Sequence, residues 1–217
     1  IDPAGYRMLS EDGQPPRFVA EAKAASAVNP WTGFGGIANG CNGAITALAV
    51  AANGDAYVAG DFRLCGDTPA NGIARWDGAA WSSLGSGSTN GVQDGIVFAM
   101  TVVGNDLYVG GSFSSAGGVE AGNIARWDGS TWSGLTDGVG SIGVSGTVYA
   151  LAALGENLIV GGALTRAGGL PVDYLARWDG STWSRLPNGP NGAVYALTSS
   201  GNQLYAGGTF QQAGGTQ

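Results

Sequence analysis

Three copies of an Arg-Trp-Asp-Gly segment carry the side chains best suited to chemistry in this sequence. A guanidinium beside an indole and a carboxylate could bind anions or sugars, and repeated carboxylates could ligate a metal ion. The copies lie 51 residues apart, and a second tryptophan follows each first one after five residues. The candidates are Arg75, Trp76, Asp77 and Trp81; Arg126, Trp127, Asp128 and Trp132; and Arg177, Trp178, Asp179 and Trp183.

A structural role explains these residues more simply. A residue type that recurs in every unit usually serves what every unit needs, so we expect each arginine to stack on a tryptophan or to pair with the nearby aspartate. Each Asp-Gly is typical of a turn in which the aspartate accepts backbone N–H groups and the glycine takes a positive φ. We predict no metal or cofactor at these positions and keep a sugar-binding or anion-binding ring as the alternative.

Catalytic constellations are not visible. The sequence has no histidine, which removes the commonest general base and the commonest metal ligand. The acidic residues outside the repeat, such as Asp61, Glu120 and Glu156, fall at different places in different units, so no spacing marks a pair of carboxylates. The sequence therefore predicts a protein that is not an enzyme.

The charge and hydropathy of the chain limit the classes of partner that it could bind. Nine basic and 16 acidic residues give a formal charge of -7 without a basic cluster, which argues against nucleic acid. Polar residues and glycines interrupt every apolar stretch well before the ~20 residues that span a bilayer, so we expect no membrane insertion within this chain. A protein partner or a surface glycan fits better, and the oligomeric state is left open.

The elements that must position these residues are short strands. Segments such as 148–154 and 158–160 are apolar on both alternating faces, and turns such as Gly155-Glu156 separate them. Strands of this kind need cover on both faces. Four strands per unit, stacked as blades between neighbouring blades, would supply that cover, so we predict an all-β propeller of four-stranded antiparallel blades.

A family resemblance supports this interpretation. Leu107-Tyr108-Val109-Gly110-Gly111, followed by Arg126-Trp127-Asp128 and Trp132, resembles the kelch repeat with its double glycine and spaced aromatics. The recurring residue pattern is also similar to repeats of the fungal cortical marker for cell polarity and of bacterial exported propellers. The resemblance covers about residues 28–217 and implies a propeller fold, but it implies no particular function.

Blade repeats start near residues 44, 96, 147 and 193, and the last one is incomplete. We predict an N-terminal strap at 1–19 and a propeller domain at 20–217, with the last blade completed by about 20–34. Such an exchange between the termini removes free sheet edges and closes four blades. The alternative is that these residues are a fragment of a larger propeller.

Cys41 and Cys65, the only two cysteines, should face each other across the first hairpin. Paired positions in an antiparallel ladder are close enough for a disulfide. We expect the bond, with two buried free thiols as the alternative. Because disulfides persist mainly outside the cytosol, the bond predicts an extracellular or cell-surface location, with the periplasm as a further option.

These observations predict a non-catalytic interaction module that presents loops on a rigid propeller. The loops at 86–95 and 136–146 are long enough to form a binding rim. A carbohydrate-binding propeller is the alternative, although these loops contain no aromatic residue. A glycan hydrolase or lyase is the third option.

Overall fold

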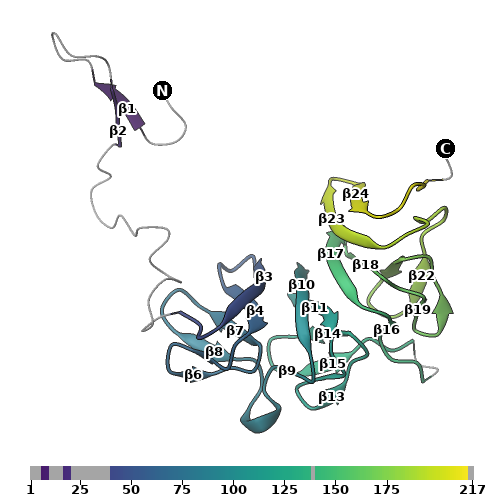
Figure 1. Ribbon diagram of the computed structural model, residues 1–217. Helices are drawn as coiled ribbons and strands as arrows, with labels where there is room; N and C mark the ends of the chain where they lie inside the picture. Colours follow the sequence, from purple (N-terminus) through teal and green to yellow (C-terminus); the bar gives the residue numbers. More distant parts are fainter. Residues whose placement is uncertain (1–5, 10–16, 21–39, 138–139, 215–217) are drawn as a thin grey trace. The chain divides into compact units, whose positions relative to one another are not determined.

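The computed structural model describes residues 6–9, 17–20, 40–137 and 140–214 (Figure 1). The chain divides into two compact units, residues 1–36 and 37–217. In the first unit, β1 (Tyr6–Leu9) and β2 (Arg17–Ala20) form an antiparallel pair. Residues 21–34 lie outside the described part, so completion of the last blade by 20–34 stays a prediction.

The second unit consists of consecutive antiparallel sheets, one for each repeat. Three of these sheets have four strands each, and the strands of a sheet follow one another in chain order. The last sheet has two strands among the described residues. These sheets are the blades of an all-β propeller, as the sequence predicts. Their strands are β3 (Ala44–Val50), β4 (Ala56–Asp61), β7 (Ile73–Trp76) and β8 (Trp81–Ser83); β10 (Ile96–Val103), β11 (Asp106–Ser112), β14 (Ile124–Trp127) and β15 (Trp132–Gly134); β17 (Val148–Leu154), β18 (Asn157–Gly162), β21 (Leu175–Trp178) and β22 (Trp183–Arg185); and β23 (Val194–Ser200) with β24 (Gln203–Gly208).

Small sheets form where one blade leads into the next. β9, which belongs to the connection after the first blade, pairs with β12 of the second blade, and β16 pairs with β19 of the third blade in the same way. The short elements are β5 (Leu64–Cys65), β6 (Thr68–Pro69), the 3-10 turn η1 (Gly87–Thr89), β9 (Val92–Gln93), β12 (Ser115–Ala116), β13 (Val119–Glu120), β16 (Val144–Ser145), β19 (Arg166–Ala167) and β20 (Leu170–Pro171).

The innermost strands β3, β10, β17 and β23 lie side by side in chain order, and β3 and β23 stand at the two ends of this row (Figure 1). Each long hairpin turns at a glycine with a positive φ, for example Gly54 and Gly155. A side chain at Gly110 would collide with Val148 of the next blade, so this glycine is needed where the backbones approach closely.

Every blade has two faces. We call the face toward the preceding blade the front face and the face toward the following blade the back face. Leu107 and Tyr108 of β11 point to opposite faces of the second blade, and both are buried. The back face of the first blade packs with the front face of the second in one apolar cluster, and the next junction repeats this arrangement. The core is therefore a series of layers between blades.

No helix in the described part of the chain is long and apolar enough to cross a membrane.

Candidate functional site: clefts between neighbouring blades

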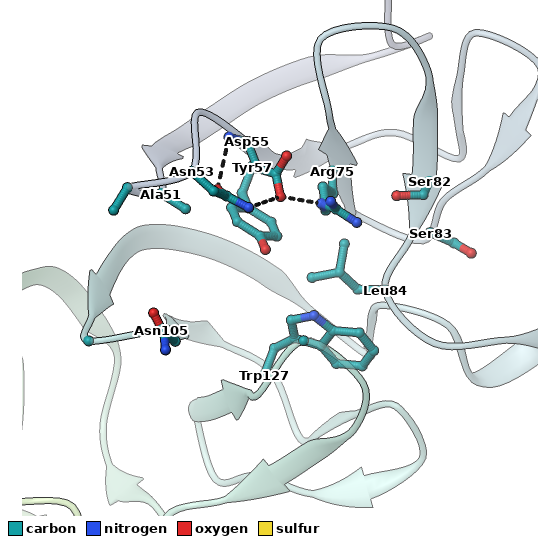
Figure 2. Close-up of a pocket in the computed structure, with 13 residues that line it drawn as sticks. Ala51, Asn53, Asp55, Tyr57, Arg75, Ser82, Ser83, Leu84, Asn105 and Trp127 are labelled. Atoms are coloured by element: carbon teal, nitrogen blue, oxygen red, sulfur yellow. Dashed lines mark hydrogen bonds and ion pairs between the residues drawn. The ribbon is translucent and has the colours of Figure 1, made fainter.

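A hollow of about 460 Å³ lies between the first and second blades (Figure 2). One wall comes from the turn after β3, from Arg75 on β7 and from the strand β8. The facing wall comes from the second blade, where the indole of Trp127 lies opposite Leu84. The repeat thus brings the arginine of one blade and the first tryptophan of the next blade into a single cleft.

An ion pair fixes the arginine of this cleft. Arg75 Nε donates to Asp55 Oδ2 at 2.7 Å, and Asn53 Nδ2 donates to the same oxygen at 2.7 Å. The carboxylate is buried, whereas the side chain of Arg75 is 38% exposed. The rest of the guanidinium has no further hydrogen-bond partner among the described residues, so its remaining N–H groups are available to a ligand in the cleft.

The electrostatics keep both members of the pair charged. The hydrogen bond from Arg75 lowers the pKa of Asp55 against the opposing effect of burial, and the same bond raises the pKa of Arg75. Burial raises the pKa of Tyr57, which lies in the same wall, so its hydroxyl stays protonated at neutral pH. The cleft therefore presents hydrogen-bond donors with little net charge.

A second cleft repeats this design between the second and third blades, with a volume of about 350 Å³. Arg126 again pairs with a carboxylate, Asp106, at 2.7 Å, and Trp178 takes the place of Trp127. In the third blade the equivalent of the aspartate is Asn157, and Arg177 forms no ion pair with a described residue. The repeat thus contains two ion-paired arginines and one unpaired arginine.

The partner of Arg75 is not the nearby Asp77 that the sequence suggested. Asp77 Oδ1 instead accepts the backbone N–H groups of Ala79 and Ala80, and Gly78 has a φ of 97°. The aspartate is thus used in the turn, as expected from Asp-Gly, and the ion pair is made across the sheet by Asp55, which directly precedes β4.

The tryptophans pack in pairs within each blade. The rings of Trp76 and Trp81 lie 5.2 Å apart, and the later pairs lie 5.3 and 5.1 Å apart. Trp132 also crosses a junction, because its Nε1 donates to the carbonyl of Leu84 at 2.9 Å. Trp132 therefore ties the second blade to the first.

The predicted disulfide between Cys41 and Cys65 is present, and the two residues form an antiparallel bridge. The bond fastens the chain that enters the first blade to β5. The alternative of two free thiols is therefore wrong for this structure.

The loop at 86–95 is largely held in place. Asn90 accepts the N–H of Asn71 through its side chain, and Gln93 Nε2 donates to three nearby carbonyls. Beside it, Asp94 and Glu120 line an open hollow of about 620 Å³. This hollow carries carboxylates and suits a cationic group.

A row of aromatic side chains crosses the innermost strands. Phe98 and Tyr149 lie 6.1 Å apart, and Tyr149 and Tyr195 lie 5.2 Å apart. Each residue occupies the irregular position of its strand, where the pairing shifts register. Sequence reasoning missed this row, although the recurring Val-Phe and Val-Tyr pairs at 97–98, 148–149 and 194–195 were a signal that could have found it.

The described residues contain no group of three His, Cys, Asp or Glu side chains that could hold a metal ion. The cleft between the first two blades contains a single carboxylate, and Arg75 already pairs with it. The side chains of Ser82 and Asn105 offer a hydroxyl and an amide to a ligand, whereas Asn53 and Ser83 already form hydrogen bonds within the first blade. The arrangement is suited to binding.

No protein-family model and no curated protein sequence matches the chain. Among solved structures, the chain is similar to one described as "YCF48 bound to D1 peptide", with 12% identity and a TM-score of 0.40. The match covers 75% of this chain and 45% of that chain, so it spans less than half of the solved protein.

Proposed function

We propose that this chain is a non-catalytic interaction module that binds a polypeptide segment in the clefts between its blades. The observation that carries this proposal is the repeated arginine beside a tryptophan from the next blade, with N–H groups left over after pairing with an aspartate. Main-chain carbonyls of an extended segment are suitable acceptors for such donors.

The charge of the chain favours a neutral or basic partner. The arginine of each of the first two clefts is balanced by its aspartate, and the whole chain carries a formal charge of -7. The open hollow that Asp94 and Glu120 line adds two carboxylates elsewhere on the described surface. Complementary charge would speed association with a basic partner and disfavour an acidic one.

We propose that the module acts outside the cytosol, at a cell surface or in the periplasm, and that its repeats are of the kelch type. The disulfide supports the location, because such bonds are rare in reducing compartments. The glycine pairs and the recurring Arg-Trp-Asp segment support the repeat type.

A random-peptide display library panned against the whole chain tests the proposal. Peptides that bind should be neutral or basic, and the double variant Arg75→Gln/Arg126→Gln should weaken their affinity about tenfold or more, as loss of a hydrogen-bonding anchor does. Arg185→Gln is the matched control, because Arg185 pairs with Asp173 and lines neither cleft. An equal loss in the control, or no retained peptide, would argue against cleft binding.

Carbohydrate binding is the second candidate, and the aromatic row favours it. Phe98 and Tyr195 expose 37% and 52% of their surfaces, and aromatic rings in a row can stack on successive sugar rings. On a glycan array, this alternative predicts a defined sugar whose binding is lost in Tyr195→Ala but kept in Tyr205→Ala. The control residue is equally exposed but lies outside the row. Cleavage of any arrayed glycan would contradict the non-catalytic assignment.

A further inference from the structure

On the front face of the first blade, the innermost strand β3 is exposed, whereas Val58 and Ala74 of the neighbouring strands β4 and β7 are buried. Leu48 is 52% exposed, whereas Met100, at the same position of the second blade, is 9% exposed. Ile45 shows the same contrast with Val97, which is fully buried. The apolar residues of this face are therefore of the type that a preceding blade covers elsewhere in the chain.

The fourth blade exposes the opposite face. Tyr205 on its back face is 52% exposed, whereas its equivalents Tyr57 and Tyr108 are 8% and 5% exposed. In the first two blades, a following blade covers these tyrosines. The fourth blade thus has the side chain for such a contact but no described neighbour on that side.

The two exposed surfaces correspond to the two halves of each internal junction. At each of the three junctions in the chain, a back face packs on the front face of the next blade. We propose that the back face of the fourth blade packs on the front face of the first blade in a second copy of this chain. The contact would continue an interface that already occurs three times within each copy.

A second copy suits these faces better than an unrelated partner. It brings the complementary half with residues already matched at the internal junctions, such as Tyr57 against the blade that carries Met100. Within one copy, β3 and β23 lie at opposite ends of the row of innermost strands (Figure 1). Because a back face meets a front face, the contact is heterologous, and two or more copies would form a ring or a row.

Light scattering after size-exclusion chromatography tests the proposal on the whole chain. We expect the wild type to have the mass of two or more chains. Leu48→Lys and Tyr205→Lys should each reduce the mass to that of one chain, because each variant places an unpaired charge in the contact. Val119→Lys is the matched control, since Val119 is an exposed apolar residue on β13 and lies on neither end face.

Mixing the two variants gives the decisive result. Leu48→Lys keeps an intact back face and Tyr205→Lys keeps an intact front face, so an equimolar mixture should recover a species of two chains. A symmetric contact between two front faces would leave Tyr205→Lys associated before mixing, and one between two back faces would leave Leu48→Lys associated. If either lysine variant loses the wild-type near-UV circular dichroism, Leu48→Gln and Tyr205→Gln replace them in the same experiment.

Several outcomes would overturn the proposal. A wild type with the mass of one chain at every concentration would mean that the chain covers its own end faces or leaves them for another protein. Association that survives both substitutions would place the contact elsewhere. A mixture that stays at the mass of one chain would exclude the pairing of back face with front face.

Discussion

In each of the first three blades, the segment that leads into the blade pairs with the short strand after the long hairpin, which is β5, β12 or β19. The contact that fixes this segment differs in the first blade. In the second blade, Val92 lies opposite Ala116, and in the third blade Val144 lies opposite Ala167. In the first blade these two positions are Cys41 and Cys65, and a disulfide joins them. One position in the repeat is thus closed by apolar packing in two blades and by a covalent bond in one.

The preceding blade explains the difference. Val92 N donates to the carbonyl of Asn71 at 3.1 Å, and Asn71 Nδ2 donates back to the carbonyl of Val92 at 2.7 Å. Gly122 and Asn123 hold Val144 in the same way. The first blade has no preceding blade among the described residues, so these hydrogen bonds have no counterpart at Cys41. The disulfide supplies the anchor that a neighbour supplies elsewhere.

The largest expected change in the free energy of unfolding comes from replacing the two cysteines of the first blade by the valine and alanine of the later blades. Cys41→Val/Cys65→Ala restores the apolar pair but opens a loop with a sequence separation of 24 residues. Losing a crosslink of this length should lower the free energy of unfolding by about 3 kcal/mol, measured by urea denaturation. Reduced wild type is the control and should lose a similar amount. A double variant as stable as the oxidised wild type would mean that packing alone suffices.

A smaller effect should follow from weakening the noncovalent anchor of the third blade. Asn123→Gly removes the bond to the carbonyl of Val144 and the bond that Oδ1 accepts from the N–H of Phe113, while glycine accepts the φ of 70°. Two lost hydrogen bonds should lower the free energy of unfolding by about 2 kcal/mol. Asn105→Gly, in an exposed turn, should change it much less. Equal effects would show that the anchor does not depend on Asn123.

Exchanging the acidic residue beside the arginine should have a still smaller effect. Asp55→Asn gives the first blade the residue that the third has, Asn157, and should lower the free energy of unfolding by less than about 1 kcal/mol, since Arg75 is partly exposed. The pKa of Asp55 is lower in the folded state than in the unfolded chain. The difference in free energy of unfolding between Asp55→Asn and wild type therefore has its full size above the ordinary pKa of aspartate. It should shrink as the pH falls through the lowered pKa.

The reciprocal variant, Asn157→Asp, offers Arg177 the missing partner and should raise the free energy of unfolding by a similar amount at neutral pH. Urea denaturation across a pH series measures both variants. A difference between Asp55→Asn and wild type that stays constant into strong acid would mean that the ion pair does not contribute.

The smallest effect concerns the Asp-Gly turns and needs no substitution. Asp128 accepts two backbone N–H groups and the hydroxyls of Ser130 and Thr131, whereas Asp77 accepts the N–H groups of Ala79 and Ala80, whose side chains have no hydroxyl. Hydrogen bonds to the charged form lower the pKa of both carboxyls. Carboxyl carbon chemical shifts followed by NMR should show Asp128 titrating at lower pH than Asp77. The reverse order would contradict the assigned turn geometry.

Much of the fold could be predicted because the same pattern of apolar segments and glycine turns recurs in every unit. Short apolar segments between glycine turns, such as 148–154 before Gly155, have few alternatives to hairpin strands, and a two-faced apolar pattern requires stacked sheets. The disulfide followed from the same hairpin geometry. The clefts could not be predicted in the same way, because each is shared between blades. The pairing of Arg75 with Asp55, 20 residues earlier, depends on the register of β4 and β7.

The uniform junctions have a consequence for inheritance. Because a back face packs on the following front face at each described junction, a duplication or deletion of one whole 51-residue unit would rejoin surfaces of the same kind. Lineages of this chain could therefore grow or shrink by complete blades more easily than by parts of a blade. An insertion of any other length would have to be absorbed by a connection such as the loop at 86–95. The first blade is less suited to a position inside the row of blades. Its Cys41 and Cys65 stand where the later blades have a valine and an alanine.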